Sequence, residues 1–496
     1  MGGGYRTKQQ SFKVQQLIHD LGLEECADSI IGTRSIKGIS GGEKKRVAFA
    51  TEILTNPPIL FCDEPTSGLD SFLALQIVNV LKNLAVTKSM TIMVTIHQPS
   101  SQVFELFDRI YLLTDGRVAF CGNQAEACDF WSELGDPLPR NFNPADHYIS
   151  AISDQHEGRK WKKTAIEICN AFDNSSIGQN VRSDAKLGSS ESRSIKDSSL
   201  LPKATVDTKG TKNRKYMAGW LEQFRSLYWR STMTVLREPT LLKVQLIQTV
   251  VIAVLTGSVY LNNSYTQQKV ANINGSLYQM ITNMAFMFQF AVLHHFCSEM
   301  QTFYREYDSG LYTVSSFFIA KNMAELPNYT LSALVFSSIL YWMSRLIPLW
   351  DAFVFYLLVG VLVQSTAISI GYAMGCIFGT VSTASAVLPI FVVPMMAFGG
   401  YFINQGSLPI YFYPFKFLSY FGYAYESLAV NEWSHVERIY GCEPPMRCYK
   451  NGSDVIKHLS FSPQNMWINV VILFLMIFIF RFIGFASLSI KARSRK

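Results

Sequence analysis

Six long apolar stretches in the second half of the chain restrict its fold more than any other feature. Each is long enough to cross a bilayer as a helix. Hydrophobic residues make up 49% of the 496 residues and charged residues only 16%, which is too apolar for an ordinary soluble protein. The first 240 residues do not share this bias. The sequence therefore predicts a domain of soluble type followed by an all-α membrane domain, with spans at about 241 to 261, 273 to 297, 321 to 344, 352 to 376, 381 to 402 and 466 to 488.

The distribution of positive charge predicts how the spans are oriented. The tail at 491 to 496 is strongly basic, and the connection near Arg305 and Lys321 also carries positive charge. Basic segments stay on the cytoplasmic side of a membrane, so both ends of the chain are expected there. The outer side then receives the connections at 262 to 272, 345 to 351 and 403 to 465.

Several residues of the predicted outer side are candidates for modification. Asn262, Asn274 and Asn451 begin N-x-[ST] sequons that lie in, or at the border of, these outer connections. Cys442 and Cys448 share the largest outer connection and are expected to form a disulfide. Closing so short a loop contributes about 2 kcal/mol in the chain-entropy treatment.

Carboxylates and a histidine follow two short apolar runs in the first part of the chain. Residues 59 to 62 are predicted to form a buried parallel strand that ends at Asp63 and Glu64. The first carboxylate can hold Mg²⁺ through water, and the second can orient an attacking water. A second strand at 91 to 96 ends in His97, a neutral donor suited to a γ-phosphate.

Ser40-Gly41-Gly42, followed by an amphipathic stretch from Glu43 to Leu54, predicts a helix N-terminus that an anion can approach. Taken singly, such a tripeptide is commonly a turn, an acidic pair is commonly a solvated loop and one histidine is commonly structural. Their order and spacing favour a nucleotide site. The chain has no G-x-x-x-x-G-K-[ST] phosphate loop, and we interpret the glycines at 2 to 4 as a flexible end.

These motifs resemble the nucleotide-binding domain of ATP-binding cassette (ABC) transporters over residues from about Tyr5 to about Ile152. The resemblance places the Walker A and Q-loop motifs before residue 1. It implies a partial P-loop-type α/β domain that uses ATP and Mg²⁺, with Asp63 on the metal and Glu64 and His97 as catalytic residues. The nucleotide-binding group that it implies consists of Ser40, Gly41, Gly42, Glu43 and the D-loop residue Asp70.

Further motifs point to one branch of this family. Segments at 63 to 70, 96 to 101 and 143 to 146 are similar to the G subfamily, whose half-transporters place the nucleotide domain before the membrane domain. Segments 107 to 110, 116 to 120 and 429 to 433 look closest to its White and Scarlet eye-pigment group.

The predicted organisation of the chain has five parts. A Ser- and Lys-rich stretch poor in large apolar residues is expected to be a disordered or loosely ordered linker. An alternation of apolar and basic residues after it predicts an interfacial helix. The parts are a partial nucleotide-binding domain at 1 to 154, the linker at 155 to 215, the interfacial helix at 216 to 240, the membrane domain at 241 to 490 and a basic cytoplasmic tail at 491 to 496.

Three features of the membrane domain bear on transport and assembly. Arg305, Glu306 and Tyr307 lie in a segment that resembles the coupling segment of the G subfamily, which rests on the nucleotide domain. The fourth and fifth spans carry no Asp, Glu, Lys or Arg, so the cargo is expected to be lipophilic or weakly polar. Glycines 371, 375 and 379 allow close helix approach, either within one subunit or in a dimer.

The resemblance implies a half-transporter that dimerises with itself or with another G-subfamily subunit. It would couple ATP binding and hydrolysis to movement of a pigment precursor, sterol or other lipid-like molecule across the plasma membrane or an organelle membrane, with no role for nucleic acid. Without a phosphate loop, hydrolysis by this chain alone is doubtful. The chain is then either an incomplete version of a complete transporter or a short isoform with one degenerate site. The alternative function is a non-transporting regulator that sequesters full-length partners.

Overall fold

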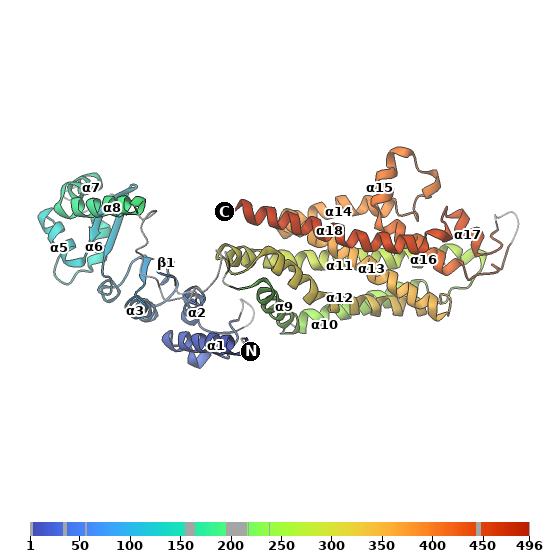
Figure 1. The fold of residues 1–496 in the computed structure, drawn as a ribbon, viewed down its shortest axis with the longest axis horizontal. Helices are drawn as coiled ribbons and strands as arrows, with labels where there is room; N and C mark the ends of the chain where they lie inside the picture. Colours follow the sequence, from blue (N-terminus) through green and yellow to red (C-terminus); the bar gives the residue numbers. More distant parts are fainter. Residues whose placement is uncertain are drawn as a thin grey trace. The chain divides into compact units, whose positions relative to one another are not determined.

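The fold is described from a computed structural model, which divides into two compact units, Met1–Val206 and Asp207–Lys496 (Figure 1). Each unit is described by itself. The residues that the structure describes are 3–32, 37–54, 57–153, 164–194, 216, 218–237, 239–442 and 448–495.

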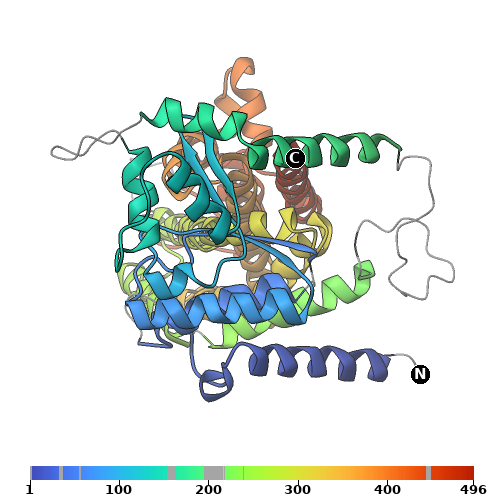
Figure 2. The ribbon, with the colours of Figure 1, turned by 90° about the vertical axis from the view of Figure 1, so that its left-hand side faces the viewer.

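The first unit contains a parallel strand pair covered on one face by helices. Strand β1 pairs with β2, and Asp63 lies opposite Thr95 at the end of the ladder. Leu60 and Cys62 of β1 are buried against the helix that crosses from one strand to the next. The dark blue helix beside the N-terminus in Figure 2 is α1. The elements of this part are α1 (Gly3–Asp20), α2 (Gly41–Ile53), β1 (Ile59–Asp63), α3 (Ser71–Thr87) and β2 (Thr91–Thr95).

A second, aromatic core of the same unit surrounds an antiparallel hairpin, β3 and β4. Phe120 of β4 is fully buried and contacts the rings of Phe130, Trp131 and Phe172. The elements of this part are α4 (Ser101–Phe104), β3 (Ile110–Thr114), β4 (Arg117–Gly122), α5 (Gln124–Glu133), α6 (Pro144–Ile152), α7 (Ala165–Asn174) and α8 (Ser176–Ser194).

Helices α7 and α8 fall inside the range 155 to 215, where the sequence predicts a disordered linker. That prediction is wrong for 164–194, because Ile168, Cys169 and Phe172 lie on one face of α7 and bury against the hairpin. Thr164 begins α7 with a side-chain cap. Residues 154–163 and 195–215 lie outside the described residues.

The second unit is a bundle of long helices (Figure 1). Helices α10 to α14 and α18 overlap the six predicted spans, although α11 continues well beyond residue 297 and α12 begins before residue 321. By length and composition, two segments of the described chain, Trp350–Phe378 and Pro463–Ser494, are apolar enough to cross a membrane, and Lys243–Val259 and Val381–Ala397 are shorter apolar helices. The helices of the unit are α9 (Trp220–Arg237), α10 (Pro239–Val259), α11 (Val270–Asp308), α12 (Val314–Met343), α13 (Trp350–Phe378), α14 (Val381–Ala397), α15 (Tyr413–Leu418), α16 (Tyr420–Trp433), α17 (Gly452–His458) and α18 (Met466–Ser494).

Helix α13 is the central helix of this bundle and lies between α11 and α18. Its glycine repeat packs within the chain. A Cβ atom on Gly371 would lie 2.8 Å from the carbonyl oxygen of Gln289, and one on Gly375 would lie 3.0 Å from the Phe296 ring. Gly379 ends α13 with a φ of 76°, a conformation that favours glycine. Of the two predicted roles of this repeat, the structure supports packing inside one subunit at Gly371 and Gly375.

The range 403 to 465, predicted as an outer loop, contains helices α15, α16 and α17. Every residue of α16 except Tyr423 is buried. Three of its polar side chains are held by neighbouring segments. The Glu426 carboxylate accepts hydrogen bonds from Asn465 and Asn469, Asn431 donates to the Ala352 carbonyl, and Glu432 accepts from Tyr265. This helix is therefore part of the core and not a solvated loop.

Candidate functional site

The predicted helix N-terminus at Ser40 is present and closely defined. The Ser40 hydroxyl accepts a hydrogen bond from the Glu43 N–H (3.3 Å), and the Ser40 N–H donates to the Glu43 carboxylate (2.7 Å). This capping box begins α2, and the hydrogen bond from the Ser40 backbone lowers the pKa of Glu43. The N–H groups of Gly41 and Gly42 are in the first turn, where no intrahelical acceptor exists. They form the positive end of a helix, which suits a phosphate group.

The acidic pair and the histidine lie at the same edge of the parallel strand pair, as predicted. The Thr95 hydroxyl donates to the Asp63 carboxylate (2.5 Å) and accepts from the Glu64 N–H (2.9 Å). His97 is exposed two residues beyond Thr95. Because parallel strands end at one edge, the Asp63, Glu64 and His97 side chains extend from the same edge of the sheet.

The backbone at this edge adopts an uncommon conformation. Glu64 has a φ of 43° and Gln98, next to His97, has a φ of 48°. Residues other than glycine seldom adopt positive φ, and such conformations concentrate where structure serves a function. The two turns that carry Glu64 and His97 are therefore the locally strained points of the strand pair.

Lys45 is a further residue of this region, and sequence reasoning missed it. Its ammonium group donates to the Ser67 carbonyl (2.5 Å), so it ties α2 to the turn that follows Glu64. Burial lowers its pKa, and the nearby Glu64 carboxylate opposes that shift. In the sequence, the only indication of such a role was that Lys45 closely follows the Ser40-Gly41-Gly42-Glu43 motif.

Asp70, predicted to bind nucleotide, caps α3 in this structure. Its carboxylate accepts a hydrogen bond from the Leu73 N–H (2.8 Å). Gly41 lies against the preceding turn, since a Cβ atom there would be 3.8 Å from Leu69. The start of α2 and the turn at Asp70 are therefore neighbours.

The described residues fit part of an ATP and Mg²⁺ site. Gly41 and Gly42 supply free backbone donors, Asp63 supplies a carboxylate of the kind that Mg²⁺ prefers, and His97 supplies an exposed imidazole. ATP, when bound, supplies the free energy of γ-phosphate cleavage. The residues of this chain would orient water and hold the phosphate end; they include no phosphate loop.

In the second unit, Glu306, one of the three predicted coupling residues, joins α11 to helix α9. The Arg230 guanidinium donates to both carboxylate oxygens of Glu306 (2.8 Å each), and the Tyr312 hydroxyl also donates to Glu306 (2.6 Å). Both contacts come from one guanidinium nitrogen, and hydrogen bonds between charged groups are stronger than those between neutral groups. Arg305 is exposed and Tyr307 is buried in the same turn.

Hydrogen bonds continue this connection along the start of α12. The Gln223 side-chain oxygen accepts from the Thr313 N–H (2.9 Å) and from the Ser316 hydroxyl (3.1 Å), and the Trp220 indole donates to Ser315 (3.0 Å). The α9 helix is thus attached at several points to the turn between α11 and α12. A displacement of either one would be transmitted to the other.

A buried charged cluster lies between α11, α12 and α13, and the sequence analysis did not predict it. Lys321, assigned from sequence to a cytoplasmic connection, is 1% exposed and lies inside α12. Its ammonium nitrogen lies 2.6 Å from Glu299 and 2.9 Å from Glu325. His295 lies 3.2 Å from Glu325, and the Tyr372 hydroxyl also donates to Glu325. The signal in the sequence was an oppositely charged pair four residues apart within an apolar helix.

The candidate modification sites differ in their surroundings. Cys442 and Cys448 form a disulfide with Cα atoms 5.7 Å apart. Asn262 is exposed, and Asn451 is partly exposed and caps α17. Asn274 lies inside α11, is 8% exposed and accepts a hydrogen bond from the Trp433 indole (2.7 Å). Its burial leaves no room for a glycan, and we do not retain Asn274 as a candidate.

Comparison with known families matches both units. The family described as ABC transporter matches residues 5–67, and families described as ABC-2 type transporter match residues 222–433 and 97–168. The first match includes Ser40, Asp63 and Glu64, and the match at 222–433 includes the coupling residues.

Individual relatives match nearly the whole chain. The "ABC transporter ATP-binding protein/permease wht-1" of Caenorhabditis elegans is 39% identical over 98% of this chain and 74% of the relative. "Protein white" of Drosophila melanogaster is 40% identical over 99% of this chain and 70% of the relative. "Protein scarlet" of the same species is 33% identical over 97% of this chain and 71% of the relative.

Proposed function

This chain belongs to the G subfamily of ABC transporters, the family of the White and Scarlet proteins, and on that premise we propose that it is a half-transporter subunit that works as a dimer. The partner is a second copy or another G-subfamily half-transporter. Members of the family hydrolyse ATP and move molecules across membranes. The dimer would couple ATP binding and hydrolysis to this movement.

The observation that carries the proposal is the start of α2. In an ABC dimer, each nucleotide lies between the phosphate loop of one subunit and the signature helix of the other. The capping box of Ser40 and Glu43 leaves the Gly41 and Gly42 N–H groups directed at such a ligand. We propose that this chain contributes these donors to a nucleotide held by its partner.

The connection to the membrane helices would run through α9. Arg230, Glu306 and Tyr312 join this helix to the end of α11, and Gln223 joins it to the start of α12. A force applied at the turn between α11 and α12 would therefore move two membrane helices and α9 together. This arrangement supports the role that the resemblance implies for the coupling segment.

The proposed cargo is lipophilic or weakly polar, such as a pigment precursor or a sterol. Helix α13 has no Asp, Glu, Lys or Arg after Asp351, and α14 has none. Lys321 contacts both Glu299 and Glu325, and His295 also contacts Glu325, so each charged group of this cluster already has a partner inside the bundle. The basic tail supports a multi-pass topology with both termini in the cytoplasm.

The test is a mixed dimer with a full-length G-subfamily subunit. Gly41→Asp places a carboxylate where the partner's phosphate would lie, whereas Gly41→Asn has nearly the same shape without the charge. A Cβ atom at this position meets only Leu69, at 3.8 Å, so both variants should fold. We expect Gly41→Asp to reduce ATPase and transport of the mixed dimer far more than Gly41→Asn does.

Two other outcomes would contradict the proposal. Equal activity of the mixed dimer with either variant would exclude the contribution of α2 in trans. If co-expression lowers the transport of the partner and Gly41→Asp makes no difference, the chain is a sequestering regulator instead.

A further inference from the structure

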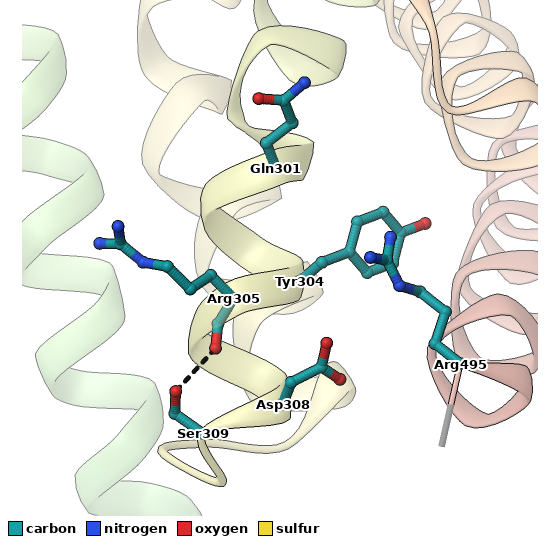
Figure 3. Close-up of a pocket in the computed structure, with 6 residues that line it drawn as sticks. All are labelled: Gln301, Tyr304, Arg305, Asp308, Ser309 and Arg495. Atoms are coloured by element: carbon teal, nitrogen blue, oxygen red, sulfur yellow. Dashed lines mark hydrogen bonds between the residues drawn. The ribbon is translucent and has the colours of Figure 1, made fainter. Parts of the chain in front are cut away.

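A cavity of about 640 Å³ lies at the end of the membrane helices that carries the basic tail. Its walls come from the last turns of α11 and from the C-terminal end of α18. Helix α11 has 39 residues and is about 58 Å long, whereas a bilayer core is about 30 Å thick. The last part of α11, residues 298 to 308, is polar, so this end of the helix extends beyond the hydrocarbon. The cavity is lined by Gln301, Tyr304, Arg305, Asp308, Ser309 and Arg495 (Figure 3).

The cavity presents both signs of charge, and its charges are not paired with each other. The Arg495 guanidinium lies over the Tyr304 ring, 4.4 Å from its centre. In Figure 3, the Asp308 side chain extends from α11 on the same side as Tyr304 and Arg495. The Arg305 side chain extends from the opposite side of the helix. Within the described residues, up to Arg495, Asp308 makes no ion pair with either arginine.

We propose that this cavity binds the headgroup of an aminophospholipid, a lipid that carries a phosphate and a primary ammonium group. The phosphate lies on Arg495, and the ammonium lies on Asp308. The primary ammonium donates hydrogen bonds to that carboxylate and to Ser309. A separated cation and anion in one cavity match a zwitterion better than a simple anion, which Asp308 would repel.

The geometry also separates this ligand from a choline lipid. A quaternary ammonium has no N–H to donate, so it binds proteins mainly through aromatic faces. One face of Tyr304 is already covered by Arg495. The basic residues Lys491 and Arg493 of the same tail add attraction for phosphate at this depth. The site therefore favours ethanolamine or serine headgroups over choline.

The experiment uses the full chain in nanodiscs and measures by native mass spectrometry which lipids it retains. We expect phosphatidylethanolamine and phosphatidylserine to be retained about tenfold over phosphatidylcholine and phosphatidylglycerol, the difference that one charge-assisted hydrogen bond supplies. Asp308→Asn should abolish the preference for the primary amine. Arg495→Gln should reduce retention of all phospholipids. These readouts do not depend on ATP turnover.

Matched controls come from the opposite end of the bundle. Asp351→Asn changes an exposed carboxylate in the same way, and Arg438→Gln removes a guanidinium that also lies over a tyrosine ring, that of Tyr440. Neither should alter lipid retention. Equal retention of all four lipids, or the same loss from the controls, would overturn the proposal. Displacement by an equal concentration of soluble phosphoethanolamine would assign the site to a free metabolite instead of a lipid.

Discussion

The two units of this protein differ in how far their apolar strand or helix faces and their charged groups are buried. In the first, β1 and β2 form a parallel pair, yet Phe61 is 73% exposed and Met93 is 49% exposed on one face. Parallel strands are usually covered on both faces. In the second, Phe288 and Val359 are fully buried, and even Lys321 is enclosed with its counter-ions. The membrane unit pairs its buried charged groups with one another, whereas the nucleotide unit exposes Asp63, Glu64 and His97.

The largest test of this contrast is ATP hydrolysis by the isolated chain. Expressed as these 496 residues, the protein should neither retain ATP tightly nor hydrolyse it. The contacts of a phosphate loop are charge-assisted hydrogen bonds worth about 1.5 to 3 kcal/mol each, so the lack of several weakens binding by orders of magnitude. Turnover by the purified protein that Glu64→Gln abolishes would show that the first unit is self-sufficient, and the contrast would fail.

The second test removes the cation of the buried cluster. Lys321→Met leaves the Glu299 and Glu325 carboxylates facing each other without it and should cost about 3 to 5 kcal/mol of stability. Replacing Glu325 by Leu in the same chain should restore much of this loss, because a buried pair can be exchanged for apolar groups at little cost. The midpoint of thermal unfolding in detergent measures both effects.

The control for this test is Lys457→Met, at an exposed position, where a change within about 0.5 kcal/mol is expected. If Lys321→Met is equally mild, the cluster is not essential to the membrane unit. Internal pairing of charge would then contribute little to the stability of this part of the bundle.

The third test concerns pH and the buried helix α16. Burial raises the pKa of Glu432 to about 7 from an ordinary value of 4.5. Between these two pH values the folded state holds a proton that the unfolded state releases. The contribution of Glu432 to the free energy of unfolding is therefore complete below about pH 4.5 and is lost as pH rises through about 7. The difference corresponds to about 3 kcal/mol.

Thermal unfolding between pH 5 and pH 8 measures this dependence, and Glu432→Gln should flatten it. His435 is the relevant control, because it lies close enough to act electrostatically on the Glu432 carboxylate. His435→Gln should leave most of the pH dependence in place. A wild-type profile that rises with pH would contradict the assignment to Glu432.

These tests also mark what the sequence could and could not predict. Apolar length predicted all six long helices, and motif order placed Asp63, Glu64 and His97 at one edge of a sheet, because both depend on local sequence. The charged cluster depends on three helices that meet in space, and Glu325 comes close to His295 and Tyr372 only in the fold. No local pattern contains that information.

The two wrong sequence predictions, a linker at α7 and a loop at α16, also concern segments whose burial depends on contacts that form only in the fold. Helix α7 was assigned to a disordered linker because its segment is polar on average, although Phe172 and its neighbours on one face bury against the hairpin. Helix α16 was assigned to a loop because it is shorter than a membrane span. Its burial depends on anchors such as Asn465 and Asn469, which are remote in sequence from Glu426.

The fourth test separates the coupling contacts from the buried core. The Arg230 side chain is 44% exposed and that of Glu306 is 17% exposed, so this pair should be worth less than the buried cluster, about 1 to 2 kcal/mol. Arg230→Gln and Glu306→Gln should each speed hydrogen exchange in α9, and the double variant should add little to either. Additive effects would mean that the two side chains do not act as a unit.

The smallest expected effect is that of the sequons on electrophoretic mobility. If 262 to 272 and 403 to 465 face the outside, glycosidase treatment should shift the mobility of the protein, and Asn451→Gln should reduce that shift. Asn274→Gln should leave the shift unchanged, because that side chain is buried against Trp433. Loss of the shift on Asn274→Gln would mean that the start of α11 is open to the glycosylation machinery, and the membrane unit would be less completely packed than its buried core indicates. No shift in the wild-type protein would count against the outer assignment of Asn451 itself.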